Sequence, residues 1–130
     1  MKMMVCYDGS NVAKAALDLA KKHAKAVNAK IYLLTSMDSR PQVTLREFEN
    51  AGKDLKDAKI IVRKDDIPCE AHLSERGLEP GEDLVKYAEE HQIDQIFIGV
   101  RRRSKVGKLI FGSTAQYVIL NALCPVVTVK

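Results

Sequence analysis

Apolar residues follow two different spacings along the chain. Short consecutive runs such as "MMVC" and "IYLL" lie between longer segments in which apolar residues return every three or four positions. The short runs are typical of strands buried on both faces, and the longer segments are typical of amphipathic helices. The predicted strands are residues 2–7, 30–36, 69–74, 94–100 and 125–130, and the predicted helices are residues 11–28, 44–64, 80–92 and 113–123.

Capping residues mark the starts of several predicted helices. Ser10 or Asn11 can cap the first helix. Thr44 and Glu47 have the spacing of a capping box, in which each side chain accepts from a backbone amide of the other. Ser113 begins the last helix in the same register. These signals support the helix boundaries that the apolar spacing predicts.

Strict alternation of strands and helices predicts an α/β fold. Right-handed β-α-β units give an open parallel sheet with helices on both faces, here a Rossmann-like sheet of five strands. The chain has 130 residues, of which 46% are hydrophobic, which suits one domain, residues 1–130, with a substantial core. The last strand runs from Pro125 to Lys130 with no helix after it, so we expect it at an edge of the sheet.

Ligands of open parallel sheets bind beyond the carboxyl ends of the strands, where the strand order reverses. Three segments are expected there: Asp8-Gly9-Ser10 after the first strand, Ser36 at the end of the second, and the loop that Gly99 opens after the fourth. That loop contains "RRRSK" and ends at Gly112-Ser113, where a helix start offers free amides to an anion. A phosphate-binding loop and a plain strand-loop-helix connection explain this segment about equally well.

The chain resembles the universal stress protein family over nearly its full length. The matching segments are "VCYDGS", "YLLTSMD", "DQIFIGV", "GKLIFGSTAQYVI" and "CPVVTVK". The resemblance implies the fold derived above and a homodimer, here through the edge strand from Pro125 to Lys130. One branch of the family binds ATP through the pattern G-x2-G-x9-G-[S/T]. Gly99, Gly112 and Ser113 match this pattern, and Arg102 stands where the second glycine is expected.

The resemblance also implies roles for individual residues. Gly99, Gly112 and Ser113 would lie near the phosphates and ribose of a bound ATP. Asp8 would lie near the ribose or hold a divalent ion such as Mg²⁺, and the backbone of Ser36 would contact the adenine. The candidate nucleotide-binding residues are Asp8, Gly9, Ser10, Ser36, Ile98, Gly99, Arg101, Arg102, Gly112, Ser113 and Thr114.

Arg102 leaves two functions open. Its guanidinium could hold a triphosphate, and the protein would then be an ATP-binding regulatory protein of the stress response. The same side chain could instead fill the phosphate site, and the protein would then be a nucleotide-free module that recognises an unknown protein partner. Nucleic-acid binding through Arg101 and its neighbours is disfavoured, because the net charge is a modest +4 and no aromatic residues interleave with the arginines.

Several classes of protein are excluded or disfavoured. Catalytic motifs such as G-x-S-x-G and the Walker loop are absent from the sequence, so at most slow ATP hydrolysis is expected. The three cysteines are far apart and lack C-x-x-C spacing, which argues against disulfides and zinc. The first residues resemble a strand rather than a signal peptide, and no apolar run is long enough to span a membrane. We therefore expect a cytoplasmic protein.

Overall fold

A computed structural model describes residues 1–37, 44–100 and 112–130. In this part of the chain strands and helices alternate as the sequence predicts, and the predicted fold class is confirmed. The strands are β1 (Lys2–Cys6), β2 (Lys30–Ser36), β3 (Cys69–Ser74), β4 (Gln95–Gly99) and β5 (Val126–Val129). The helices are α1 (Asn11–Val27), α2 (Leu45–Lys64), α3 (Pro80–Glu90) and α4 (Ser113–Asn121).

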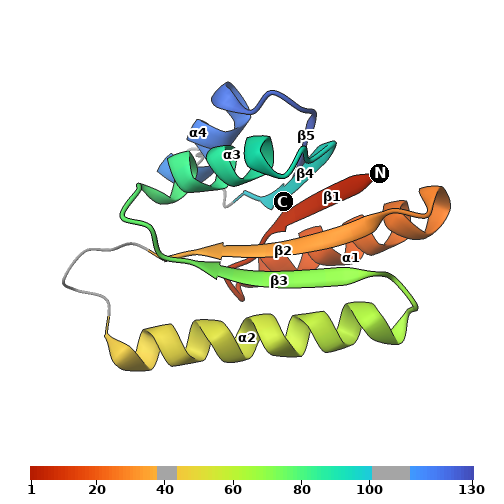
Figure 1. Ribbon diagram of the computed structural model, residues 1–130, viewed down its shortest axis with the longest axis horizontal. Coiled ribbons are helices and arrows are strands. Elements are labelled where there is room, and N and C mark those ends of the chain that lie inside the picture. Colours follow the sequence, from red (N-terminus) through yellow and green to blue (C-terminus); the bar gives the residue numbers. More distant parts are fainter. Residues whose placement is uncertain (38–43, 101–111) are drawn as a thin grey trace.

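The five strands form one parallel sheet in the order β3-β2-β1-β4-β5 (Figure 1). The chain moves outward from β1 through β2 to β3, and then crosses back to place β4 on the other side of β1. The strand order therefore reverses between β1 and β4. Their carboxyl ends, near Cys6 and Ile98, are paired in register at this point. The two edges are β3 and β5, so the predicted edge position of the last strand is confirmed.

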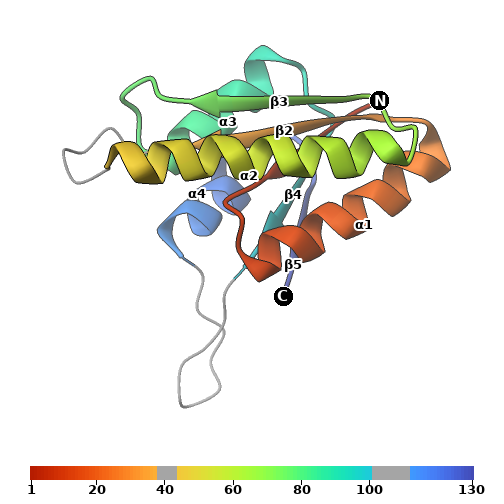
Figure 2. The same cartoon turned by 90° about the horizontal axis from the view of Figure 1, so that it is seen from below.

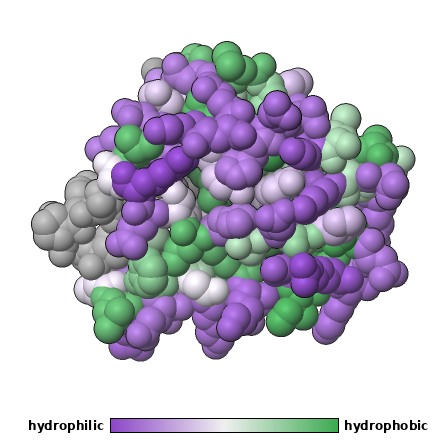
Figure 3. Space-filling model, viewed as in Figure 1, coloured by the Kyte–Doolittle hydropathy of each residue, from purple (hydrophilic) through white to green (hydrophobic). Residues whose placement is uncertain are grey.

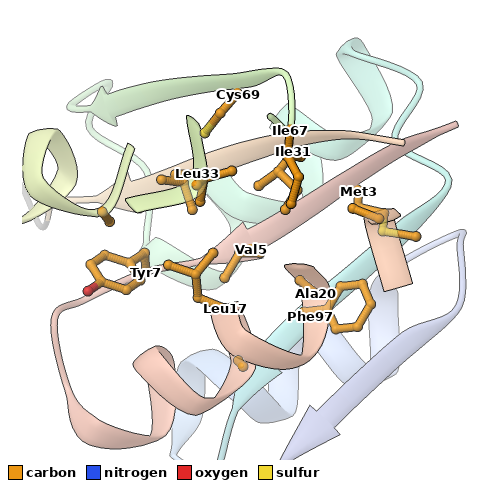
Figure 4. Close-up of a cluster of buried hydrophobic side chains, with 14 of the residues drawn as sticks. Met3, Val5, Tyr7, Leu17, Ala20, Ile31, Leu33, Ile67, Cys69 and Phe97 are labelled. Atoms are coloured by element: carbon orange, nitrogen blue, oxygen red, sulfur yellow. The ribbon is translucent and has the colours of Figure 1, made fainter. Parts of the chain in front are cut away.

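Helices cover both faces of the sheet. Figures 1 and 2 show α1 and α2 on one face and α3 and α4 on the other. Side chains of β1 alternate between the two layers: Met3 and Val5 pack with α1 and α2, whereas Met4 packs with α3 and α4. Figure 4 shows the first of these cores, where Phe97 of β4 lies beside Ala20 of α1. Burial on both faces explains why the strands are almost uniformly apolar.

Local sequence signals explain most of the helix ends. The Ser10 hydroxyl accepts from the amide of Ala13 at 3.2 Å and caps α1. The capping box of Thr44 and Glu47 is present at the start of α2, as predicted. Asn28 ends α1 in the left-handed conformation with φ 56°, which asparagine adopts more readily than most residues.

One predicted helix start is wrong in detail. Ser113 does not cap α4: Gly112 holds the N-cap position, and its carbonyl accepts from the amide of Gln116 at 2.9 Å. Leu45 follows the apolar spacing of α2 but is 74% exposed, because it lies in the first turn, beyond the part of α2 that buries Leu55 and Val62. In the described residues no helix is long and apolar enough to cross a membrane. The cytoplasmic location stays a prediction.

Candidate functional site

A cleft opens at the carboxyl ends of the strands, where the strand order reverses. Its volume is about 390 Å³, which lies in the range of small-molecule sites. The first turns of α1, α3 and α4 and the ends of β1, β2 and β4 contribute its walls. The lining residues are Cys6, Tyr7, Asp8, Ser10, Val12, Ala13, Leu34, Thr35, Ser36, Pro80, Leu84, Ile98, Gly99, Gly112, Ser113, Thr114 and Ala115.

The turn after β1 contributes an exposed carboxylate to the cleft. One oxygen of Asp8 accepts from the amide of Ser10 at 2.9 Å, which holds the turn closed. Gly9 has φ 79°, a left-handed conformation that only glycine adopts without strain. Gly9 is not one of the lining residues, because its α-carbon faces Asp54 of α2. The structure therefore gives Gly9 a conformational role in the turn.

Gly99 lies at the end of β4, where the backbone of α1 packs directly against the strand. A β-carbon built at this position would lie 2.6 Å from the carbonyl carbon of Val12 and 2.7 Å from its oxygen. No real β-carbon tolerates such contacts with backbone. Glycine is thus required here by the packing of α1 on β4, whether or not a ligand is bound.

The start of α4 has different surroundings. Gly112 has φ −64°, which any residue can adopt, and a β-carbon there would have no described atom within 4 Å. Packing in the described residues therefore does not require glycine at this position. The next residues, Ser113 and Thr114, begin α4 and line the cleft. Their backbone amides lie in the first turn of α4, where amides have no partner within the helix, so they are available to an anion.

Buried and partly buried hydrogen bonds fix the end of β2. The Thr35 hydroxyl donates to the carbonyl of Tyr7 at 2.5 Å. The next hydroxyl, that of Ser36, donates to Oδ2 of Asp83 at 2.5 Å. Asp83 lies in the first turns of α3 and is 1% exposed. Arg76 binds the same carboxylate through Nε at 2.6 Å.

The carboxylate of Asp83 is held in its charged form. Burial raises the pKa of Asp83, but hydrogen bonds from Ser36, Ser74 and Arg76 outweigh burial. The pKa of Asp83 is therefore below its ordinary value. Its place near the N-terminus of α3 also favours negative charge. Arg76 in turn contacts Glu90 through Nη1 at 2.6 Å, so the network runs from the cleft wall to the surface.

Two further ionisable side chains at the cleft are held protonated at neutral pH. Burial is the main cause that raises the pKa of the Cys6 thiol to about 12. Burial and the nearby carboxylate of Asp54 raise the pKa of Tyr7. Neither group supplies a thiolate or phenolate nucleophile near pH 7. The described residues also contain no group of three or more His, Cys, Asp or Glu side chains placed to hold a metal ion.

The structure brings together most of the residues that the sequence singled out. The described candidates that line the cleft are Asp8, Ser10, Ser36, Ile98, Gly99, Gly112, Ser113 and Thr114. Arg101 and Arg102 lie outside the described residues. Sequence reasoning missed Thr35 and Tyr7, although both stand at strand ends beside predicted residues. It also missed the support from Asp83 and Arg76, which only the fold brings next to Ser36.

A Rossmann-like sheet with a cleft at its switch point defines a class of proteins that bind small ligands at this edge. The universal stress protein family is matched over residues 1–130, and the chain belongs to this family. A universal stress protein of Thermus aquaticus is 30% identical over 98% of this chain and 97% of its own length.

Solved structures agree with this assignment. A universal stress protein from Archaeoglobus fulgidus is 37% identical, has a TM-score of 0.91, and is covered over 100% of this chain and 98% of its own. A second structure from the same organism, described as a complex with dAMP, is 32% identical with a TM-score of 0.85 and the same coverage of both chains. The TM-scores place the whole fold of this chain in the family.

Proposed function

We propose that this protein binds an adenine nucleotide in the cleft at the switch point and acts as a regulatory protein of the stress response. The observation that carries the proposal is the start of α4. Among the described residues, no atom lies within 4 Å of a β-carbon built at Gly112, beside the first-turn amides of Ser113 and Thr114, in the position where open α/β sheets bind phosphate. The similar protein of Archaeoglobus fulgidus that is described with dAMP supports the same ligand class.

The surrounding residues suit the other parts of a nucleotide. Ser113 and Thr114 would hold the phosphates through amides and hydroxyls. Asp8 would accept from the ribose, or would bind Mg²⁺ together with the phosphates, since Mg²⁺ often takes only one or two protein carboxylates. The end of β2 at Ser36 would contact the base. The regulatory state of the protein would depend on whether ATP, with its triphosphate, occupies the cleft.

We expect binding without efficient catalysis. Of the ionisable side chains described in the cleft, Cys6 and Tyr7 are kept protonated by their raised pKa values. Asp8 already uses one carboxylate oxygen to close its own turn. The expected hydrolysis of ATP is therefore slow, and the protein would respond to nucleotide mainly by binding.

Released nucleotide tests the proposal directly. The purified protein is denatured, and the supernatant is analysed by chromatography for ATP, ADP and AMP. The melting temperature is then measured with added ATP and Mg²⁺, and ligand at 100 times its Kd should stabilise the fold by about 2.7 kcal/mol. Absence of released nucleotide together with an unchanged melting temperature would contradict the proposal.

Arg102 separates nucleotide binding from the alternative of a nucleotide-free interaction module. If the arginine supports binding, Arg102→Gly should weaken ATP binding because a charge-assisted contact is lost. If it fills the phosphate site, the same variant should gain affinity. Arg103→Gly, at an arginine outside the candidate residues, is the matched control for the loss of one positive charge in the same segment.

We further propose a homodimer through β5. The strand is an edge, and an unpaired apolar edge promotes association. Apolar side chains are also exposed at the end of α4 and in the segment that leads into β5: Leu120 by 72% and Leu123 by 85%. Figure 3 shows hydrophobic side chains along the top of this face, where α4 lies in Figure 1. Antiparallel pairing of two β5 strands would cover both features.

Thr128→Pro tests the dimer. The carbonyls of Pro125 and Val129 accept from β4, so the alternate residue Thr128 directs its backbone groups to the open edge. Proline removes the amide on that side only, and edge strands tolerate it. Light scattering at micromolar concentration should give twice the mass of one chain for the wild type and for Thr128→Val, and a single mass for Thr128→Pro. A monomeric wild type would contradict the dimer.

A further inference from the structure

The start of α3 touches α4 directly beside the cleft. A β-carbon built at Gly81 of α3 would lie 2.7 Å from Cβ of Tyr117 in α4, 3.0 Å from its Cγ and 3.2 Å from its Cδ1. Gly81 is buried, and its φ is not positive, so the backbone conformation does not require glycine here. The contact with Tyr117 therefore explains why a residue that favours helices poorly is the second residue of α3.

The two helices that meet at this contact also form part of the cleft wall. Pro80, the residue before Gly81, lines the cleft. Ser113 and Thr114 line it as well, and they lie one turn before Tyr117 in α4. All five residues line a smaller groove of about 190 Å³ next to the cleft. The contact is thus one helical turn away from the amides to which we assign the phosphate.

Rotation of a side chain cannot make room for a methyl group at position 81. Rotation about χ1 moves Cγ and Cδ1 of Tyr117, but it leaves Cβ fixed relative to the helix backbone. Carbon atoms in contact prefer a separation of about 3.5–4.0 Å, so the two helices would have to move apart by roughly 1 Å. They also pack together in the core, where Leu84 of α3 shares a buried cluster with Ala115 and Val118 of α4. The closest approach at Gly81 therefore limits how near α4 lies to α3.

We propose that Gly81 and Tyr117 set the distance between α3 and α4, and thereby the position of the α4 amides at the phosphate of a bound nucleotide. This inference rests on the nucleotide site proposed above. Because hydrogen bonds hold a helical turn together, a displacement of Tyr117 carries the amides of Ser113 and Thr114 with it. Charge-assisted hydrogen bonds are short, about 2.7–2.9 Å, and a shift of roughly 1 Å would lengthen them beyond that range.

Gly81 is a positioning residue. It is not one of the residues that line the cleft, and it acts on the ligand only through Tyr117. The expected effect of a substitution is therefore confined to the part of the binding affinity that the phosphate contributes.

The experiment compares AMP with adenosine, which lacks only the phosphate. The Kd of each is measured by isothermal titration calorimetry for the wild type and for Gly81→Ala. For the wild type we expect AMP to bind at least about tenfold more tightly, the size of hydrogen bonds to a charged group. In Gly81→Ala the Kd of AMP should rise about tenfold, whereas the Kd of adenosine should stay nearly unchanged.

The ratio of the two Kd values separates positioning from a general loss of stability, which would weaken both ligands equally. Gly52→Ala is the matched control. It also changes a helical glycine, but no described atom lies within 4 Å of a β-carbon built at Gly52 in α2. This variant should keep the wild-type ratio.

Variants of Tyr117 test the contact without overpacking, and they decide the question if Gly81→Ala does not fold. Tyr117→Ala removes two of the three contacting atoms, so α4 loses its spacer and the preference for AMP over adenosine should fall. Tyr117→Phe keeps all three atoms and should keep the preference.

Three results would count against the inference. An unchanged ratio in the folded Gly81→Ala and Tyr117→Ala variants would overturn it and leave the nucleotide site intact. Equal affinity of the wild type for AMP and adenosine would mean that the α4 amides do not bind the phosphate, and would overturn it too. Failure of the wild type to bind either ligand would overturn the proposed function and this inference together.

Discussion

The two sides of the cleft are built differently. Close packing fixes the end of β4, at Gly99 against Val12, and a partly buried hydrogen bond fixes the end of β2, at Ser36 against Asp83. The start of α4 has Gly112, whose α-carbon borders open space in the described structure. One side would keep its shape without a ligand, whereas on the other side the described residues leave room next to Gly112. Two glycines of one sequence motif can therefore be needed for unrelated causes, one for the packing of the fold and the other for room next to a ligand.

Gly99→Ala should have the largest effect on the stability of the fold. The added β-carbon would clash with the backbone of Val12 at 2.6 Å, and α1 must move away from β4 to accept it. We expect a loss of about 2–3 kcal/mol in the free energy of unfolding, near the upper end for overpacking. Urea denaturation followed by circular dichroism measures this loss. An unchanged midpoint would show that the strand end is less tightly fixed than its contacts indicate.

Asp83→Asn should have an intermediate effect that depends on pH. Because the folded pKa of Asp83 lies below its unfolded value of about 3.9, the charged carboxylate stabilises the fold above that value and this contribution disappears as the pH falls through the folded pKa. The stability difference between wild type and variant should be constant from about pH 6 to 8 and shrink below about pH 4. Urea midpoints at each pH give the difference. A difference independent of pH down to about 3 would contradict the charged, buried state of Asp83.

Gly112→Ala should have the smallest effect on stability. Alanine suits φ −64° and restricts the unfolded chain, whereas it is a poorer N-cap residue than glycine. These effects oppose each other, so the free energy of unfolding should change by less than about 0.5 kcal/mol. The new methyl group would, however, occupy volume next to the proposed phosphates, and we expect the Kd for ATP to rise about tenfold. A large loss of stability with unchanged ATP affinity would reverse the contrast between the two glycines.

Much of the fold could be predicted because its signals are local. Apolar runs identified the strands, and capping residues such as Thr44 marked helix starts correctly. Local signals leave undecided how deeply a side chain is buried and which of two neighbouring residues caps a helix. Leu45 has the right spacing for burial, but the sheet does not extend to the first turn of α2. Ser113 has the right type for an N-cap, but α4 takes its cap one residue earlier.

The site was predictable only in part for the same reason. Residues at strand ends could be assigned to one edge of the sheet from topology alone. The role of Asp83 could not, because its first-turn position also suits the helix dipole, and its partner Ser36 is 47 residues away in the sequence. Likewise, glycine at position 99 suggested a ligand, whereas the contact with Val12 that requires it exists only in the folded protein.

The contact between Gly99 and Val12 has a consequence for how family motifs are used. A glycine that the fold itself demands should persist in a protein that has lost its ligand, so its presence carries little information about binding. The informative position is Gly112, where the described packing would accept a side chain. A motif search that weighted these two glycines equally would therefore count too many family proteins as nucleotide-binding. A search weighted toward position 112 would better separate proteins that bind a nucleotide from proteins that do not.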